Sequence, residues 1–317
     1  MRRRTLLQAL AAVAVMPPPA MAAPARLRGL FPIAQTPFTT DDRLDTAALA
    51  HQVTFCARTG VPGLIWPQLA SNWSTLREDE RLHGAEALLA AAKGTAVSVV
   101  IGVQANNGDL ESSLRMLRHA EAHGAAAIIS LPPAKASETE MVAYYRRIGA
   151  ETGLPLVLQT QGTMSVELVE NVYRAAPTLA CIKDEAGNPL QRYDRIRALT
   201  GNRVAIFAGK GCTEMLSELK LGFDGYCPSM FCTDLFQKVF EFWNGGHHKE
   251  AGELFARILA LRSIPNVMPY LMVLRGIFPE TVTTRTPAGQ KAPVPLDDGD
   301  KALVRSVWND LLAPYAR

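Results

Sequence analysis

The chain of 317 residues lacks an apolar run long enough to cross a bilayer, and it lacks a paired-cysteine motif. The apolar run at residues 9–16 is well short of the roughly 20 residues that a transmembrane helix needs. The five cysteines are odd in number and contain no C-x-x-C pair, which excludes a small disulfide scaffold. The six histidines form no ligand pattern with them. We therefore expect no metal site and interpret most of the thiols as buried small hydrophobic groups.

Two nucleotide-binding patterns are also missing from the sequence. No glycine fingerprint follows the first apolar run, which argues against an open, doubly wound dinucleotide-binding sheet. Lys210 lies between Gly209 and Gly211, but a P-loop needs its second glycine directly before the lysine and a Ser or Thr after it. The sequence therefore predicts no bound cofactor.

The first 25 residues are typical of a targeting segment. Arg2, Arg3 and Arg4 precede the short apolar run, and residues 20–23 form an A-x-A type cleavage site. Paired arginines ahead of leucines indicate the twin-arginine route. We expect residues 1–25 to be a signal peptide and the mature chain to be periplasmic or otherwise exported, with no membrane span. Without these three arginines, 30 basic residues balance 30 acidic ones, so charge gives no reason to expect nucleic acid or an anionic membrane as a partner.

From residue 29 onward, short apolar runs alternate with longer segments that have apolar residues at three- and four-residue spacing. Residues 110–123 and 165–176 are two examples of the helical spacing, and Ser165 is a suitable N-cap for the second. Eight repeats of strand and helix predict a closed parallel barrel. The expected strands are residues 30–36, 63–66, 97–103, 127–131, 156–160, 179–184, 204–209 and 225–229.

The fold class that follows is α/β, a (β/α)8 TIM barrel with extra C-terminal helices. We expect the barrel to occupy residues 26–246, and residues 247–317 to form a helical extension that packs on it. The helical segments of that extension are expected at 248–262, 267–274 and 300–312. An extended arm rich in Thr, Pro and Gly is expected at 279–298.

Chemistry in such a barrel takes place at the carboxyl ends of the strands, and one of these ends carries Lys183. Period-two alternation puts Lys183 on the same face as Cys181 and Leu179. If that face is the barrel interior, apolar walls surround the amine, and desolvation favours its neutral, nucleophilic form. Position alone is equally consistent with a lysine whose ammonium reaches the solvent.

Residues 182–188 have the sequence IKDEAGN, which resembles the lysine segment of the dihydrodipicolinate synthase / N-acetylneuraminate lyase family. The resemblance implies that Lys183 forms a Schiff base with a keto acid. Other stretches lie in the family's order over nearly the whole mature chain: 36–38, 74–76, 79–80, 119–121, 124–125, 132–133, 222–225, 274–276 and 285–287.

Three features of that family have no counterpart here. Gln68, Leu69, Ala70, Ser71 and Asn72 replace the motif with paired hydroxyl side chains that holds the keto acid. No tyrosine follows Pro133, since Tyr144 and Tyr145 fall in the next helix and are expected outside the barrel. The arginine that the family places after the fifth strand, for a distal carboxylate, is also missing.

Other groups must therefore bind the substrate and transfer protons. Possible acid–base groups at strand ends are Glu185, Lys135 and Lys210, and we choose Glu185 because it shares a face with Lys183. The candidate substrate-binding residues also lie at strand ends; in the loop at 69–72 the backbone N–H groups would bind a carboxylate. These candidates are Ala70, Ser71, Asn72, Gln159, Gln161, Lys210 and Ser229.

The expected function is that of a Schiff-base-forming lyase, an aldolase or dehydratase, acting on a 2-keto acid such as pyruvate or a sugar-derived keto acid. Because the family's proton relay is missing, a catalytically impaired relative that binds a small acid or a protein partner is the alternative. The resemblance also implies a homotetramer or homodimer.

Overall fold

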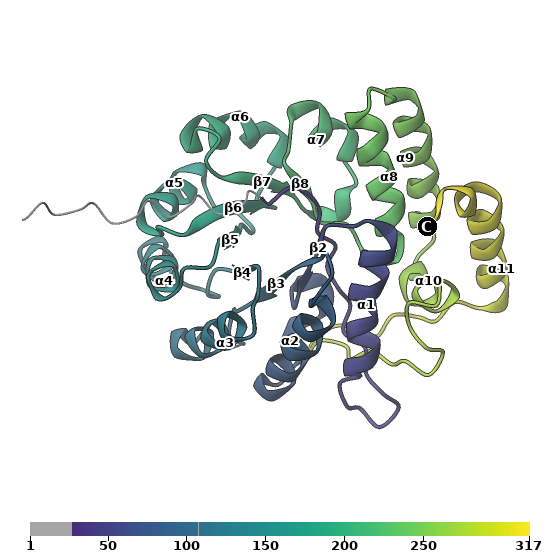
Figure 1. Ribbon diagram of the computed structural model, residues 1–317, viewed down its shortest axis with the longest axis horizontal. Coiled ribbons are helices and arrows are strands. Elements are labelled where there is room, and N and C mark those ends of the chain that lie inside the picture. Colours follow the sequence, from purple (N-terminus) through teal and green to yellow (C-terminus); the bar gives the residue numbers. More distant parts are fainter. Residues whose placement is uncertain (1–26, 107) are drawn as a thin grey trace, which may run out of the picture.

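The computed structural model describes residues 27–106 and 108–317, in which eight strands alternate with helices (Figure 1). The predicted signal peptide, residues 1–25, lies outside the described residues and stays a prediction. The strands are β1 (Gly29–Leu30), β2 (Gly63–Trp66), β3 (Ser98–Gly102), β4 (Ala127–Ser130), β5 (Leu156–Gln159), β6 (Leu179–Asp184), β7 (Ala205–Ala208) and β8 (Gly225–Tyr226).

All strands are parallel, in the order β1-β8-β7-β6-β5-β4-β3-β2. The bridge from Ile33 to Ile65 joins the β1 and β2 ends of the sheet, so the barrel closes. The expected TIM barrel is thereby confirmed. The first and last strands are shorter than predicted, because Pro32 and Pro228 lack the N–H that a ladder needs. Beyond these prolines the pairing continues only as the isolated bridges of Ile33 with Ile65 and Ser229.

Helices surround the strands, and the last three lie at one side of the barrel (Figure 1). No helix in the described part of the chain is long and apolar enough to span a bilayer. The predicted N-cap is confirmed, since the Ser165 side chain accepts a hydrogen bond from the N–H of Leu168. The helices are α1 (Thr46–Thr59), α2 (Glu78–Ala92), α3 (Leu110–Ala122), α4 (Glu138–Glu151), α5 (Val166–Ala175), α6 (Pro189–Thr200), α7 (Met215–Leu221), α8 (Thr233–Asn244), α9 (His248–Arg262), α10 (Val267–Leu274) and α11 (Asp298–Val307).

Alternation along each strand creates two apolar layers. One fills the space between the strands and the helices, and the other fills the barrel interior. The rings of Phe31 and Phe207 meet across the interior, with centroids 5.3 Å apart. All five cysteines are buried, as expected from the sequence. The interior layer consists of Phe31, Ile33, Ile65, Val100, Ala127, Ile129, Val157, Cys181, Ala205, Phe207 and Cys227.

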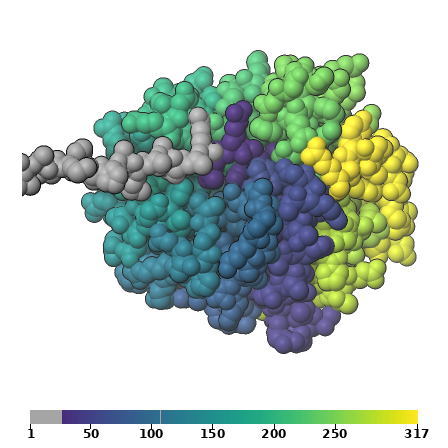
Figure 2. Space-filling view, viewed as in Figure 1, coloured from purple at the N-terminus to yellow at the C-terminus, as the bar shows by residue number. Residues whose placement is uncertain are grey.

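The C-terminal helices form one edge of the molecule, where they lie beside α1 (Figure 2). Arg275, directly after α10, donates two hydrogen bonds to Asp234 of α8, at 2.8 and 2.6 Å. Both side chains are almost fully buried, and the Arg275 guanidinium also lies over the ring of Trp308. This ion pair fastens the extension to the barrel.

The segment between α10 and α11 has almost no regular structure and is largely exposed, as predicted for an extended arm. Arg285 holds it against the barrel by two hydrogen bonds to the carboxylate of Glu80, at 2.8 and 2.9 Å. Arg285 also donates to Asp42 at 2.7 Å. Arg285 donates to the carbonyl of Thr75 as well, at 3.1 Å, so the arm is fixed beside the loop that follows β2.

Candidate active site

Lys183 lies inside the barrel near the carboxyl end of β6. The Cys181 side chain, two residues earlier, belongs to the interior apolar layer, so alternation directs Lys183 inward as well. In the ladder Lys183 is aligned with Gln159 of β5 and with Phe207 of β7. Only 3% of Lys183 is exposed. The lysine is thus a buried amine among strand ends, not a solvated surface group.

The apolar walls expected around this amine are incomplete, because Glu185 reaches it. Nζ of Lys183 lies 2.8 Å from Oε1 of Glu185. The same oxygen accepts a hydrogen bond from the backbone N–H of Lys210 at 2.8 Å. The side-chain amide of Gln159 donates to the other carboxylate oxygen, Oε2. Three donors from three strand ends therefore hold one carboxylate over the lysine.

The charge of Glu185 follows from two opposed effects. Burial by itself raises the pKa of a carboxyl group, but the Lys183 charge and the hydrogen bonds outweigh burial and hold the pKa of Glu185 below its usual value. Glu185 is therefore an ionised proton acceptor at neutral pH. The neighbouring thiol differs, because burial raises the pKa of Cys227 to about 12 despite the Lys183 charge. At neutral pH Cys227 is a neutral thiol and a poor nucleophile.

A clamp on the outer side of β6 fixes this arrangement. Thr160 Oγ1 donates to Asp184 at 2.6 Å and accepts from the backbone N–H groups of Glu185 and Ala186, at 2.9 and 3.0 Å. Arg192 donates to the other oxygen of Asp184 at 3.0 Å. We did not predict these positioning roles. The sequence carried one signal for them: Asp184 alternates to the outer face of its strand, and the adjacent predicted strand ends in a threonine, Thr160.

Gly209 makes room for the carboxylate. A Cβ atom at this position would lie 2.0 Å from Oε1 and 2.3 Å from Cγ of Glu185. The φ angle of Gly209 is −112°, outside the left-handed region that favours glycine. Close approach of the Glu185 side chain is the reason that no larger residue fits.

The loop after β2 uses its polar groups internally. The Ser71 hydroxyl donates to the carbonyl of Ala34 at 2.6 Å, and the N–H groups of Ser71 and Asn72 donate to Gln68 and Leu69. The Asn72 amide donates to the Arg285 carbonyl at 3.2 Å. Ala70 is exposed. The amides of Ser71 and Asn72, expected to bind a carboxylate, therefore already have partners in the loop.

Two glutamines just after β2 and β3, which we did not predict as site residues, form a second polar pair at strand ends. The Gln68 amide donates to Gln104 Oε1 at 3.1 Å, and Gln104 donates to the Pro67 carbonyl at 3.0 Å. Oε1 of Gln68 and Oε1 of Gln159 are buried, with no hydrogen-bond partner in the part of the chain that the structure describes. A buried unpaired oxygen costs about 1–3 kcal/mol. Such groups occur where a ligand or a water completes the bonding.

The other predicted substrate-binding residues occupy different positions. Gln161 is half-buried, and its backbone carbonyl accepts a hydrogen bond from the N–H of Met164. Lys210 is exposed, and its ammonium donates to the Gly187 carbonyl at 2.6 Å. Its backbone N–H, rather than its side chain, meets the carboxylate of Glu185. Ser229 bridges to Ile33 just after β8.

The tyrosines of α4 lie outside the barrel, as expected. The Tyr144 hydroxyl contacts Ser130 Oγ at 2.8 Å and Ser113 Oγ at 3.1 Å. Tyr145 donates to the Ser130 carbonyl at 3.0 Å. Both phenols are therefore engaged in the layer between helix and strand, where neither serves Lys183.

Comparison with known proteins agrees with this fold. A 4-hydroxy-tetrahydrodipicolinate synthase of Bradyrhizobium diazoefficiens is 27% identical over 302 residues, which cover 90% of this chain and 97% of that protein. An N-acetylneuraminate lyase of Rhizobium meliloti is 28% identical over 266 residues, which cover 80% and 86%. The crystal structure of dihydrodipicolinate synthase from Rhodopseudomonas palustris has the same fold, with a TM-score of 0.77 at 22% identity, covering 90% and 98% of the two chains. The model of the dihydrodipicolinate synthetase family matches residues 26–290, so this chain belongs to that family.

Proposed function

We propose that the chain is a Schiff-base-forming lyase, an aldolase or dehydratase, that acts on a 2-keto acid such as pyruvate or a sugar-derived keto acid. One observation carries the proposal: a buried lysine at the carboxyl end of β6 lies 2.8 Å from an ionised carboxylate. A lysine amine adds to a ketone only after it loses a proton. Glu185 is at hydrogen-bond distance to accept that proton.

The proton then has a complete route. Glu185 takes a proton from Lys183, and Nζ forms a bond to the keto carbon while the carbonyl electron pair moves to oxygen. Glu185 returns this proton to that oxygen and then carries a second proton to it from the nitrogen of the adduct. The oxygen leaves as water, and a protonated imine remains, which is the electron sink for the bond that breaks next. Glu185 thus takes the part that a tyrosine relay would have, typically worth about 10²–10⁴-fold in rate.

The unpaired amide oxygens favour a hydroxylated substrate. Oε1 of Gln68 and Oε1 of Gln159 are acceptors, and each would be satisfied by a substrate hydroxyl. Pyruvate has no hydroxyl group, whereas a sugar-derived keto acid has several. The name of one relative, an N-acetylneuraminate lyase, is consistent with lyase chemistry on a sugar-derived acid.

The alternative is a catalytically impaired relative that binds a small acid or a protein partner. The closure of the site favours it. The Glu185 carboxylate pairs with Lys183 and accepts hydrogen bonds from Lys210 and Gln159. A substrate must therefore displace this carboxylate before the substrate reaches the amine. The hydroxyl of Ser71 is also engaged within its loop.

Borohydride trapping separates the two functions. The full chain is incubated with pyruvate and a panel of sugar-derived 2-keto acids, reduced, and mapped by peptide mass spectrometry. We expect an adduct on Lys183 and none in Lys183→Ala. The matched control Lys210→Ala changes a nearby exposed lysine and should keep the adduct. Tight binding of an acid by calorimetry with no adduct on Lys183 would overturn the lyase and support the alternative.

Export and assembly form part of the same proposal. We propose that residues 1–25 direct the chain through the twin-arginine route, so that replacing Arg2, Arg3 and Arg4 by lysine retains it in the cytoplasm on cell fractionation. We also propose a homodimer or homotetramer. Light scattering on the mature chain measures its mass directly, and a monomer would contradict this part.

A further inference from the structure

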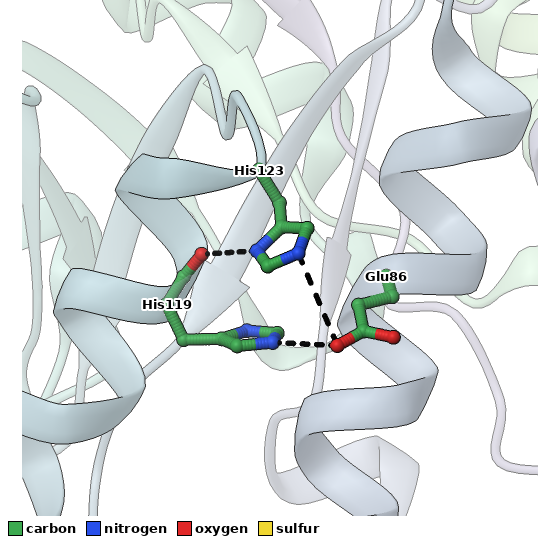
Figure 3. Close-up of side chains that lie close together, drawn as sticks. All are labelled: Glu86, His119 and His123. Carbon is green, nitrogen blue, oxygen red and sulfur yellow. Dashed lines mark hydrogen bonds and ion pairs between the residues drawn. The ribbon is translucent and has the colours of Figure 1, made fainter.

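Two neighbouring helices, α2 and α3, bring together three side chains that could hold a metal ion (Figure 3). Glu86 comes from α2, His119 comes from the last turn of α3, and His123 follows one turn later. One ligand atom from each lies within 4.8 Å of the other two. Nε2 of His119 is 2.8 Å and Nε2 of His123 is 3.9 Å from the same oxygen of Glu86.

The orientation of His123 is set by the backbone. Its Nδ1 lies 2.8 Å from the carbonyl oxygen of His119, so Nδ1 carries the proton and donates it. The lone pair of His123 is then on Nε2, the atom that faces Glu86 in Figure 3. A backbone carbonyl that fixes the second nitrogen of a histidine is the usual support of a metal-binding imidazole.

The His119 ring has no comparable constraint. Its Nδ1 is buried and has no hydrogen-bond partner among the residues that the structure describes. The Nε2 proton can therefore move to Nδ1 when a metal takes Nε2, without breaking another hydrogen bond.

We propose that Glu86, His119 and His123 form a binding site for a divalent transition-metal ion of the zinc, nickel or copper class. Two imidazoles and one carboxylate match these ions, whereas calcium and magnesium prefer oxygen ligands alone. Bond lengths of about 2.0–2.1 Å place tetrahedral ligands roughly 3.3 Å apart. The separations of 2.8 and 3.9 Å from Glu86 lie on either side of this value. The two imidazole rings, whose centroids are 4.2 Å apart, must turn so that both Nε2 atoms face one ion.

The site is open on one side. About 43% of the His123 side chain and 45% of the Glu86 side chain are exposed, whereas His119 is mostly covered. A fourth position remains for water or for His83, an exposed residue one turn before Glu86 on α2. The ion joins α2 to the end of α3 and thereby braces two helices of the barrel wall. This proposal does not depend on the lyase function.

Zinc titration of the full chain, prepared without an affinity tag, tests the site. We expect one ion per chain by calorimetry and at least roughly tenfold weaker binding in His123→Ala, an exposed change that should leave the fold intact. Glu86→Gln and His119→Ala should weaken binding similarly. The matched control is His247→Ala with His248→Ala, because this adjacent exposed pair is the competing surface site.

Thermal unfolding gives an independent result. Zinc at one hundred times its Kd should raise the Tm by about 5 °C in the unmodified chain and in the control, but not in His123→Ala. Absorption of bound cobalt reports a tetrahedral site without reference to activity. Binding that is lost only in the control, or no binding below millimolar zinc, would overturn the proposal.

Discussion

Nζ of Lys183 and Oε1 of Glu185 lie 2.8 Å apart at the carboxyl end of β6, where they form an almost fully buried ion pair. The pair has two consequences for chemistry. The carboxylate is close enough to take the proton that the amine must lose, and it also covers the amine. A substrate must therefore move Glu185 without removing it from the site.

Glu185→Gln removes the acceptor while it keeps the shape of the side chain. We expect borohydride trapping on Lys183 to survive but its rate to fall about 10²–10⁴-fold, because proton removal from the amine then depends on water. The pKa of Glu185 lies below the usual carboxyl value. In the unmodified chain, Glu185 therefore accelerates trapping at pH values above the usual carboxyl pKa, and this acceleration is lost as the pH falls through the lower pKa of the folded state. The trapping rate of the unmodified chain should therefore fall at acidic pH, whereas the trapping rate of Glu185→Gln should not show this fall. Equal rates at every pH would contradict the role of Glu185.

Gly209→Ala tests the position of the same carboxylate from the end of the neighbouring strand, β7. The added Cβ would lie 2.0 Å from Oε1 of Glu185, so the side chain must move away from Lys183. We expect the trapping rate to fall roughly tenfold or more and the Tm to fall as well, because the added methyl group overpacks the site. The matched control is Gly153→Ala, where a Cβ meets no atom within 4 Å. A change of similar size in the control would show that the effect is not specific to Glu185.

Asp234→Asn tests the attachment of the C-terminal helices. Its carboxylate accepts two hydrogen bonds from Arg275 and one from the backbone N–H of Arg317. Removing one partner of a buried ion pair costs about 3–5 kcal/mol, because the other charge stays buried and unpaired. Urea unfolding should show this loss. Arg43→Ala, which breaks an exposed pair with Asp41, should change the free energy of unfolding by less than about 1 kcal/mol.

Glu218→Gln should stabilise the protein at alkaline pH. Burial, with some help from the Glu214 charge, raises the pKa of Glu218 to about 8 from 4.5, and its Oε2 has no hydrogen-bond partner among the described residues. The folded state thus binds the Glu218 proton more tightly than the unfolded state does. The stability that this protonation contributes is fully present below pH 4.5 and is lost as the pH rises through about 8.

The glutamine variant does not titrate. We expect its unfolding free energy to exceed that of the unmodified chain by on the order of 2–4 kcal/mol at pH 8.5 and by much less at pH 4.5. Thermal melts across this range measure the difference. The exposed Glu280→Gln variant is the control. A difference between Glu218→Gln and the unmodified chain that stays constant with pH would contradict the raised pKa.

The spacing of apolar residues along the sequence was sufficient to predict most of the strands and helices. The segment predicted as a strand at residues 179–184 is β6, and those predicted as helices at 248–262 and 267–274 are α9 and α10. Alternation and helical spacing depend on residues within one element, so they are visible in one dimension. The prediction of the final helix was less accurate, since α11 begins at Asp298 and continues into a π-helical turn from Trp308.

The sequence by itself determined the barrel and the shared face of Cys181, Lys183 and Glu185, because each follows from strand periodicity. The catalytic roles of Lys183 and Glu185 stay predictions. Only the tertiary structure decided that this face points into the barrel. It also decided which donors hold the Glu185 carboxylate and that Thr160 clamps Asp184. It likewise decided that two histidines meet a glutamate from another helix. These contacts join side chains from separate elements, and their distances are set by how the strands and helices pack.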